Sequence, residues 1–107
     1  SRTNKFKESL TFSDYQKSDR DFAFVVDKHI NAQNLTEVIS DIDNSLIKDV
    51  KIFDVYEGEN IPSGKKSIAL KVTIQSDYKT LNENDLTDIS NKIVNSVEEK
   101  IGAKLRS

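Results

Sequence analysis

Residues 48–75 read KDVKIFDVYEGENIPSGKKSIALKVTIQ, two apolar-patterned segments joined by a loop that contains Gly58, Pro62 and Gly64. In the second segment, apolar residues at every second position alternate with small or polar ones. This is the periodicity of a strand with one buried face and one face toward water. Glycine and proline in the connection are typical of a turn. The stretch predicts an antiparallel hairpin, from which the rest of the chain can be interpreted.

The first segment of this hairpin changes phase partway along. Two apolar pairs follow each other in opposite phase: Val50 and Ile52, then Phe53 and Val55. A two-residue repeat buries all four on one face only if one extra residue is inserted, as in a β-bulge near 52–53. With that bulge, Asp54 and Tyr56 face away from the core. Without it, Ile52, Asp54 and Tyr56 share one face, and Tyr56 is partly buried.

Further strand and helix patterns flank the hairpin. Residues 19–27, DRDFAFVVD, alternate like a strand. A helix with Asn31 as its N-cap is predicted after it, within 30–47, from an apolar stripe of Leu35, Val38, Ile39, Ile42 and Leu46. A second helix, capped by Asn82 and stopped by Gly102, has the stripe Leu86, Ile89, Ile93, Val97 and Ile101. The closing AKLR can add a short last strand.

The order strand, helix, strand, strand, helix, strand predicts an α+β fold of the ferredoxin-like, split βαβ kind. Such a fold has a four-stranded antiparallel sheet with two helices on one face and the other face open. The chain of 107 residues is long enough for one core. We therefore expect a single domain over 19–107, preceded by a leading segment, 1–18, with a short strand at 8–12. Because the chain starts at Ser1, we expect it to be a fragment of a longer protein.

Composition argues against chemistry within the chain. It has no cysteine and one histidine, His29, and it lacks a Gly-rich phosphate loop, so we expect neither catalytic residues nor a metal site. We also expect no cofactor and no membrane span, and hence a cytoplasmic protein. Sixteen basic against 18 acidic residues give a net charge of −2, unlike the basic excess of most nucleic-acid-binding domains. Any RNA contact would need a local basic patch.

The open sheet face is the remaining candidate for function. Open faces of this kind bind single-stranded RNA by stacking bases on exposed aromatic rings, with cations holding phosphates. Tyr56 is the candidate ring, with small neighbours from Ala23, Ser67 and Ala69. Positive charge can come from four residues: Arg20, Lys65, Lys66 and Lys71. The simpler alternative is a tyrosine at a sheet edge beside solvated lysines, in a protein-interaction or small-ligand regulatory module on the same fold.

Four motifs are more specific than the pattern of strands and helices: DRDFAFVVD (19–27), FDVYEGENIPSGKKSIAL (53–70), TLNENDL (80–86) and IGAKLRS (101–107). In order and spacing they resemble the C-terminal ferredoxin-fold anticodon-binding domain of the bacterial phenylalanyl-tRNA synthetase beta subunit, over about residues 15–107. There are two departures. Tyr15-Gln16 stands where the family often has Phe-Pro, and Glu57 stands where the family often has a basic residue.

The resemblance implies a non-catalytic domain that binds the anticodon stem-loop of phenylalanine tRNA. Its other partners would be the remainder of the beta chain and the alpha subunit, which holds ATP, magnesium and phenylalanine. It implies that Tyr56 stacks on an anticodon base. The other matching positions are Arg20 with Asp21, Asp54, Lys66 and Ser67, and to these we add Lys65 as a candidate RNA contact. Arg20, Asp54 or Ser67 could equally form an internal network that locks the bulge.

Overall fold

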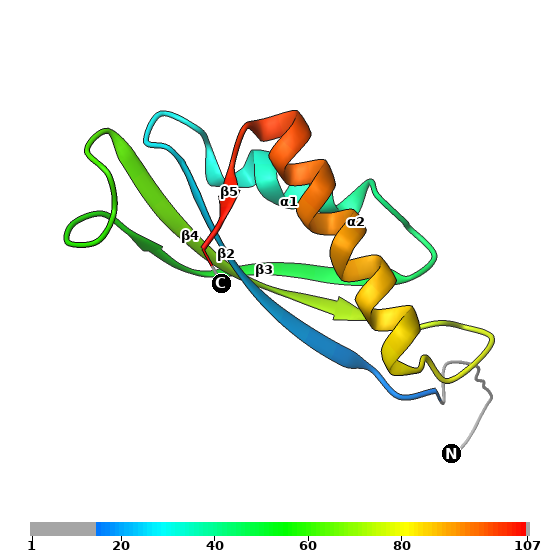
Figure 1. The fold of residues 1–107 in the computed structure, drawn as a ribbon. Coiled ribbons are helices and arrows are strands. Elements are labelled where there is room, and N and C mark those ends of the chain that lie inside the picture. The colour runs from blue at the N-terminus through cyan, green and yellow to red at the C-terminus, as the bar shows by residue number, and fades with distance from the viewer. Residues whose placement is uncertain (1–14, 107) are drawn as a thin grey trace, which may run out of the picture.

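The computed structural model describes residues 15–106 and contains four strands and two helices (Figure 1). In chain order these are β2 (Ser18–Asp27), α1 (Ala32–Ser40), β3 (Ile47–Tyr56), β4 (Lys65–Ile74), α2 (Glu83–Ile101) and β5 (Lys104–Leu105). The predicted order of elements is therefore confirmed, including the short last strand. The strand expected at 8–12 lies outside the described residues.

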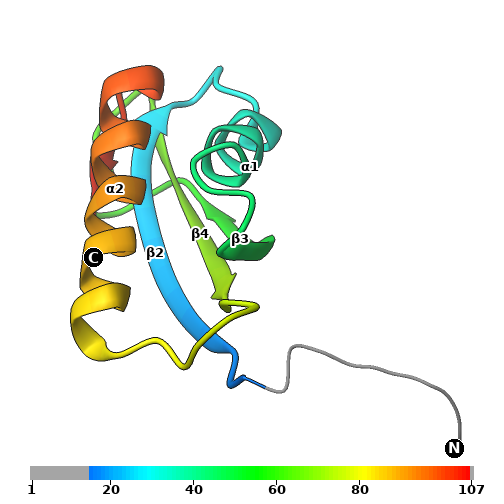
Figure 2. The same ribbon diagram turned by 90° about the vertical axis from the view of Figure 1, so that its right-hand side faces the viewer.

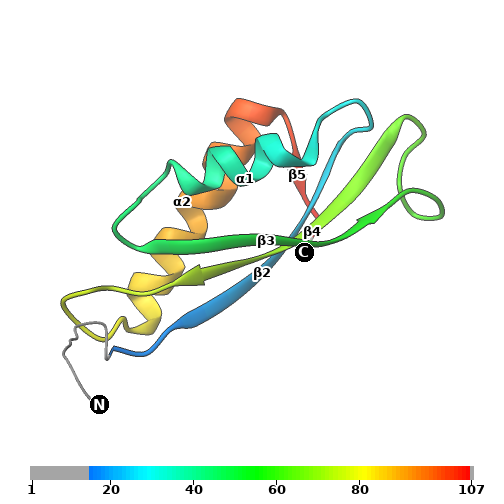
Figure 3. The same cartoon turned by 180° about the vertical axis from the view of Figure 1, so that it is seen from behind.

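The strands form one antiparallel sheet in the order β3-β4-β2-β5. Both helices lie on the same side of it, as the front and back views show (Figures 1 and 3). The view turned by 90° shows α1 on the side of β3 and α2 on the side of β2 (Figure 2). The fold is thus the predicted ferredoxin-like α+β fold, and the sheet face away from the helices is open.

The alternating strands and the helix stripes meet in one core. Its fully buried side chains come from β2, β4 and both helices: Phe24, Val26, Ile68, Leu70, Val72, Ile74, Leu35, Ile39, Ile93 and Val97. The stripe predicted for α2 is confirmed, with only Ile101 half-buried at its end. The helices and the sheet therefore pack through the faces that the sequence pattern indicates.

Short polar contacts set the ends of the helices. Asn31 accepts a hydrogen bond from the Gln33 backbone N–H (2.9 Å), and Asn82 forms a capping box with Asp85. The first helix is shorter than its apolar stripe suggests, since it ends at Ser40. The reason lies in Asp43, whose carboxylate accepts hydrogen bonds from Ser45 and the Leu46 N–H and forms a turn in place of another helical turn.

The predicted β-bulge is confirmed, but its expected effect on burial is wrong. The register with β4 shifts between Ile52 and Asp54, which leaves Phe53 as the extra residue. We expected Phe53 and Val55 in the core, yet they are 57% and 48% exposed. β3 is an edge strand, and the hairpin end of β3 and β4 extends past the helices (Figures 1 and 3). Val55 therefore faces the helix side without a helix to cover it, and Phe53 has no partner in β4.

Candidate nucleic-acid interface

A row of four aligned residues crosses the open face at the hairpin end of the sheet. The register places Tyr56 opposite Ser67, Ser67 opposite Val25, and Val25 opposite Lys104. Directly opposite residues of antiparallel strands point to the same face. Since Val25 lies between two core residues of β2, the whole row points away from the helices. The structure thus favours the arrangement in which the bulge turns Tyr56 outward.

The Tyr56 side chain is oriented by the loop that follows it. Its hydroxyl donates a hydrogen bond to the Glu59 carbonyl oxygen (3.3 Å). A Cβ at Gly58 would lie 3.0 Å from the hydroxyl oxygen, so a glycine there lets the backbone pass close to the ring. Tyr56 is nevertheless 38% exposed. The ring is therefore held in place and remains partly exposed.

Arg106 is the residue of this site that the sequence reasoning missed. Its backbone N–H donates to the Ala23 carbonyl oxygen (2.6 Å), which extends the β5 pairing by one residue. Its side chain then crosses the sheet: Nη1 donates to Ser67 Oγ at 3.4 Å, and the guanidinium carbon lies 6.0 Å from the centroid of the Tyr56 ring. That distance is within the range of a cation–π contact. The only sequence signal was the Leu-Arg at the end of the motif.

Three of the candidate site residues besides Tyr56 lie with it on the open face, and the environments of Ser67 and Asp54 are well defined. Ser67 is only 3% exposed and accepts the Arg106 hydrogen bond, so its hydroxyl is part of an internal contact. Asp54 is exposed and pairs with Ala69, which shares its face with Ser67. A carboxylate accepts hydrogen bonds only. Asp54 therefore suits N–H donors and not phosphates.

The two lysines at the start of β4 point to opposite faces. Lys65 pairs with Asp27 on the open face, whereas Lys66 pairs with the core residue Val26 on the helix side. The Asp27 carboxylate accepts the His29 backbone N–H (2.9 Å), which lowers its pKa, and the nearby charges of His29 and Lys65 lower it further. Lys65 thus joins the site, while Lys66 does not.

Positive charge also surrounds a hollow next to this row. The hollow has a volume of about 270 Å³ and is lined by Val25, Pro62, Lys65, Gly102 and Lys104. Lys65, Lys104 and Arg106 bring three cations to this end of the open face, where Asp27 and Asp54 supply two carboxylates. The cations that an RNA contact would need are therefore present, in a mixed cluster of charges.

Arg20 is not part of this cluster. It pairs with the core residue Val72 and so faces the helix side, at the other end of β2 from Tyr56. There its guanidinium forms an ion pair with Glu83 in the first turn of α2 (3.4 Å). Its neighbour Asp21 lies on the open face, opposite Lys71.

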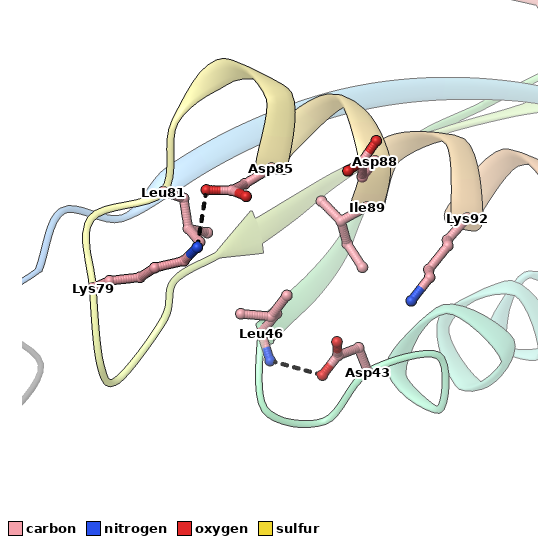
Figure 4. Close-up of a pocket in the computed structure, with 8 residues that line it drawn as sticks. All are labelled: Asp43, Leu46, Lys79, Leu81, Asp85, Asp88, Ile89 and Lys92. Atoms are coloured by element: carbon pink, nitrogen blue, oxygen red, sulfur yellow. Dashed lines mark hydrogen bonds and ion pairs between the residues drawn. The ribbon is translucent and has the colours of Figure 1, made fainter.

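A second hollow, on the helix side, has a volume of about 190 Å³, and several of the charged residues that line it already have structural roles. Figure 4 shows Asp43 beside Leu46, and Lys79 beside Asp85, along its wall. The Ser45 hydroxyl and the loop N–H groups lower the pKa of Asp43, and the Asn82 N–H lowers that of Asp85. Both carboxylates thus hold turns or caps. Within residues 15–106 we found no cluster of side chains suited to a metal ion, and neither described helix is long and apolar enough to span a membrane.

An open antiparallel sheet with two helices on its other face defines a ferredoxin-like domain, and an oriented aromatic ring beside cations is an arrangement with which such sheets bind single-stranded nucleic acid. Residues 13–106 match the family model described as the ferredoxin-fold anticodon binding domain, and the chain belongs to that family.

The relatives of this chain are similar to it over most of its length. This chain is 39% identical over 100 residues to the phenylalanine–tRNA ligase beta subunit of Rickettsia prowazekii (strain Madrid E). The matched region covers 94% of this chain and 12% of that protein. The corresponding subunit of Ehrlichia canis (strain Jake) is 44% identical over 100 residues, 94% of this chain and 13% of that protein. That of Bradyrhizobium diazoefficiens is 41% identical over 106 residues, 99% of this chain and 13% of that protein. The chain thus spans about an eighth of the length of these relatives.

Proposed function

We propose that this chain is the non-catalytic domain with which a phenylalanine–tRNA ligase binds the anticodon stem-loop of phenylalanine tRNA. The observation that carries the proposal is the Tyr56 ring on the open face, fixed by its hydroxyl and the nearby Arg106 guanidinium. A fixed ring loses little freedom when a base stacks on it, and a neighbouring cation can hold the phosphate of the same nucleotide.

The other residues divide the work of recognition. Lys65 and Arg106 would attract the RNA backbone, and Asp54 would accept a hydrogen bond from N–H groups on a base edge. Ser67 would fix the Arg106 side chain through the hydrogen bond between them. Arg20 and Lys66 lie on the helix side, so a role for them requires RNA that reaches around the sheet; their part in binding stays a prediction.

The relatives, of which this chain spans about an eighth, support a place for the domain in a larger enzyme. We infer that the remainder of the beta chain and an alpha subunit complete a cytoplasmic ligase that uses ATP and magnesium to attach phenylalanine to its tRNA. The domain proper would run over 19–107, with 1–18 as the segment that leads into it. Its task would be to position the tRNA while the chemistry takes place elsewhere.

The test is Tyr56→Ala in the complete synthetase. We expect weaker binding of phenylalanine tRNA by about 1–3 kcal/mol, the usual value of one base–aromatic stack. Phenylalanine activation without tRNA should be unchanged. Tyr56→Phe, which keeps the ring and loses the bond to Glu59, is the matched control and should bind nearly as tightly as the original. A Tyr56→Ala enzyme with a lower melting temperature but unchanged tRNA affinity would return Tyr56 to a purely structural role.

A further inference from the structure

The open face carries a second aromatic ring, placed there by the bulge. Phe53 is 57% exposed and borders a hollow of about 270 Å³, with Lys51, Lys71 and Asp21 as its other walls. Burying a phenylalanine side chain releases a favourable free energy, because its apolar surface leaves water. Phe53 does not contribute this free energy to folding, because its ring stays exposed, whereas Ile47 of the same strand is buried. Phe53 is therefore available to a partner.

The two lysines beside the ring indicate the charge of that partner. Lys51 and Lys71 lie directly opposite each other across β3 and β4. Like charges at opposite positions of a sheet destabilise it. Asp21 flanks Lys71 from β2, but among residues 15–106 neither lysine forms an ion pair. An anion between them would relieve the repulsion.

We propose that Phe53, Lys51 and Lys71 form a second nucleotide site, which takes one base on the Phe53 ring and its phosphate between the lysines. The site rests on the proposed function, since it extends the surface that begins at Tyr56. The occupant is a second, unstacked nucleotide of the same RNA loop.

The spacing along β3 supports an unstacked loop. Phe53 and Tyr56 are three residues apart, at most about 10 Å at a rise of about 3.3 Å per residue, and the bulge shortens the first step. Stacked bases of a duplex strand are only about 3.4 Å apart. Two neighbouring rings at this separation would bind bases that are splayed apart, which is how single-stranded loops are read.

The chemistry of the patch favours RNA over a protein partner. The buried centres of protein interfaces are depleted in charged residues, whereas here three charged side chains surround one ring. A ring between cations is instead the combination that binds single-stranded nucleic acid. Contact with another protein or with another part of the ligase is the alternative that the experiment has to separate.

The experiment measures binding of the complete synthetase to phenylalanine tRNAs in which single nucleotides of the anticodon loop lack their base. With unmodified tRNA, Phe53→Ala should weaken binding roughly 5- to 150-fold, the equivalent of one stack. Across the tRNAs that lack one base, there should be one loop position at which Phe53→Ala no longer weakens binding relative to the original synthetase. Tyr56→Ala should lose its effect at a different loop position. Val55→Ala, which trims an exposed apolar residue on the helix side of the same strand, is the matched control and should bind normally.

The outcomes separate the inference from the proposed function. If Phe53→Ala binds tRNA normally while Tyr56→Ala does not, the second site is refuted and the proposed function stands. The second site is also refuted if both variants lose their effect at the same nucleotide, or if Phe53→Ala lowers only the melting temperature of the synthetase, as a contact within the protein would. If neither variant affects binding, both ideas fail. Lys51→Ala gives an independent reading, since loss of a phosphate contact should reduce the salt dependence of log Kd by about one.

Discussion

The guanidinium carbon of Arg106 lies 6.0 Å from the centroid of the Tyr56 ring, although the two residues belong to opposite edges of the sheet. Tyr56 is the last residue of the edge strand β3, and Arg106 directly follows the other edge strand, β5. The Arg106 side chain spans the intervening strands and bonds to Ser67 on the way. Arg106 thus connects the end of β5 to Ser67 of β4 and to the candidate stacking ring of Tyr56. The last strand has only two residues, so Arg106 gives this short segment a role beyond pairing.

Arg106→Ala is expected to weaken tRNA binding and to reduce its salt dependence, because the substitution removes both the cation and the group beside the ring. Arg106→Lys should retain the salt dependence but lose part of the affinity, since an ammonium lacks the planar face of a guanidinium. Kd values for the complete synthetase at several salt concentrations distinguish these effects. Equal affinity for all three proteins would contradict a role for Arg106 in binding.

The adjacent lysines of β4 provide a matched pair. Lys65 points to the open face and Lys66 to the helix side, so Lys65→Ala should lower tRNA affinity and the salt slope more than Lys66→Ala does. Both substitutions remove one positive charge, so a general effect of net charge would appear equally in both. The salt dependence of Kd is again the measurement, and a larger effect of Lys66→Ala would oppose the assignment of RNA to the open face.

Gly58→Ala should destabilise the chain through the ring it adjoins. Gly58 has φ +140°, and a Cβ there would lie 3.0 Å from the Tyr56 hydroxyl oxygen. Backbone strain of this kind costs about 1–3 kcal/mol, and the clash adds to it. Gly64→Ala is the control, since Gly64 has φ +81° but no atom within 4 Å of the added Cβ.

Denaturant unfolding of both variants, alone and combined with Tyr56→Ala, measures the two contributions. In the Tyr56→Ala background, Gly58→Ala should destabilise the chain less than it does in the original background. The destabilisation caused by Gly64→Ala should be the same in both backgrounds. Equal costs for the two glycine variants in the original background would argue against the contact.

The turn after α1 should make stability depend on pH. Hydrogen bonds from the Ser45 hydroxyl and the N–H groups of Ser45 and Leu46 lower the pKa of Asp43 in the folded chain. A carboxyl with a lowered folded pKa stabilises the fold above its unfolded pKa of about 3.9 and loses that contribution as pH falls through the folded value. Asp43→Asn should therefore reduce stability at neutral pH and approach the original chain in acid. Denaturant unfolding at pH 7 and pH 3, with Asp88→Asn as the control on α2, would show this. A difference that does not change with pH would contradict it.

Periodicity predicted most of the fold because β2, β4 and α2 each bury one regular face. The phase change in β3 even predicted the bulge. The predicted burial of Phe53 and Val55 was wrong for two reasons. The bulge turns Phe53 to the open face. Val55 does point to the helix side, but alternation does not report whether a helix covers that position. Alternation could have predicted that Arg20 and Lys66 point to the helix side, since each is in phase with core residues of its strand. Arg106 could not be placed, since a two-residue strand has no period and the contact with Tyr56 depends on tertiary structure.

The bulge at Phe53 constrains the number of residues in β3 as well as their kind. Side chains alternate along a strand, so the same residues paired with β4 without the bulge would exchange the two faces of everything between Phe53 and the hairpin loop. Asp54 and Tyr56 would then point toward the helices and Val55 toward the open side. Deleting Phe53 would instead let Ile52 and Asp54 pair in regular register with Leu70 and Ala69, which keeps Tyr56 on the open face and removes the second ring. We therefore expect domains that use this face to have either this bulge or one residue fewer in β3.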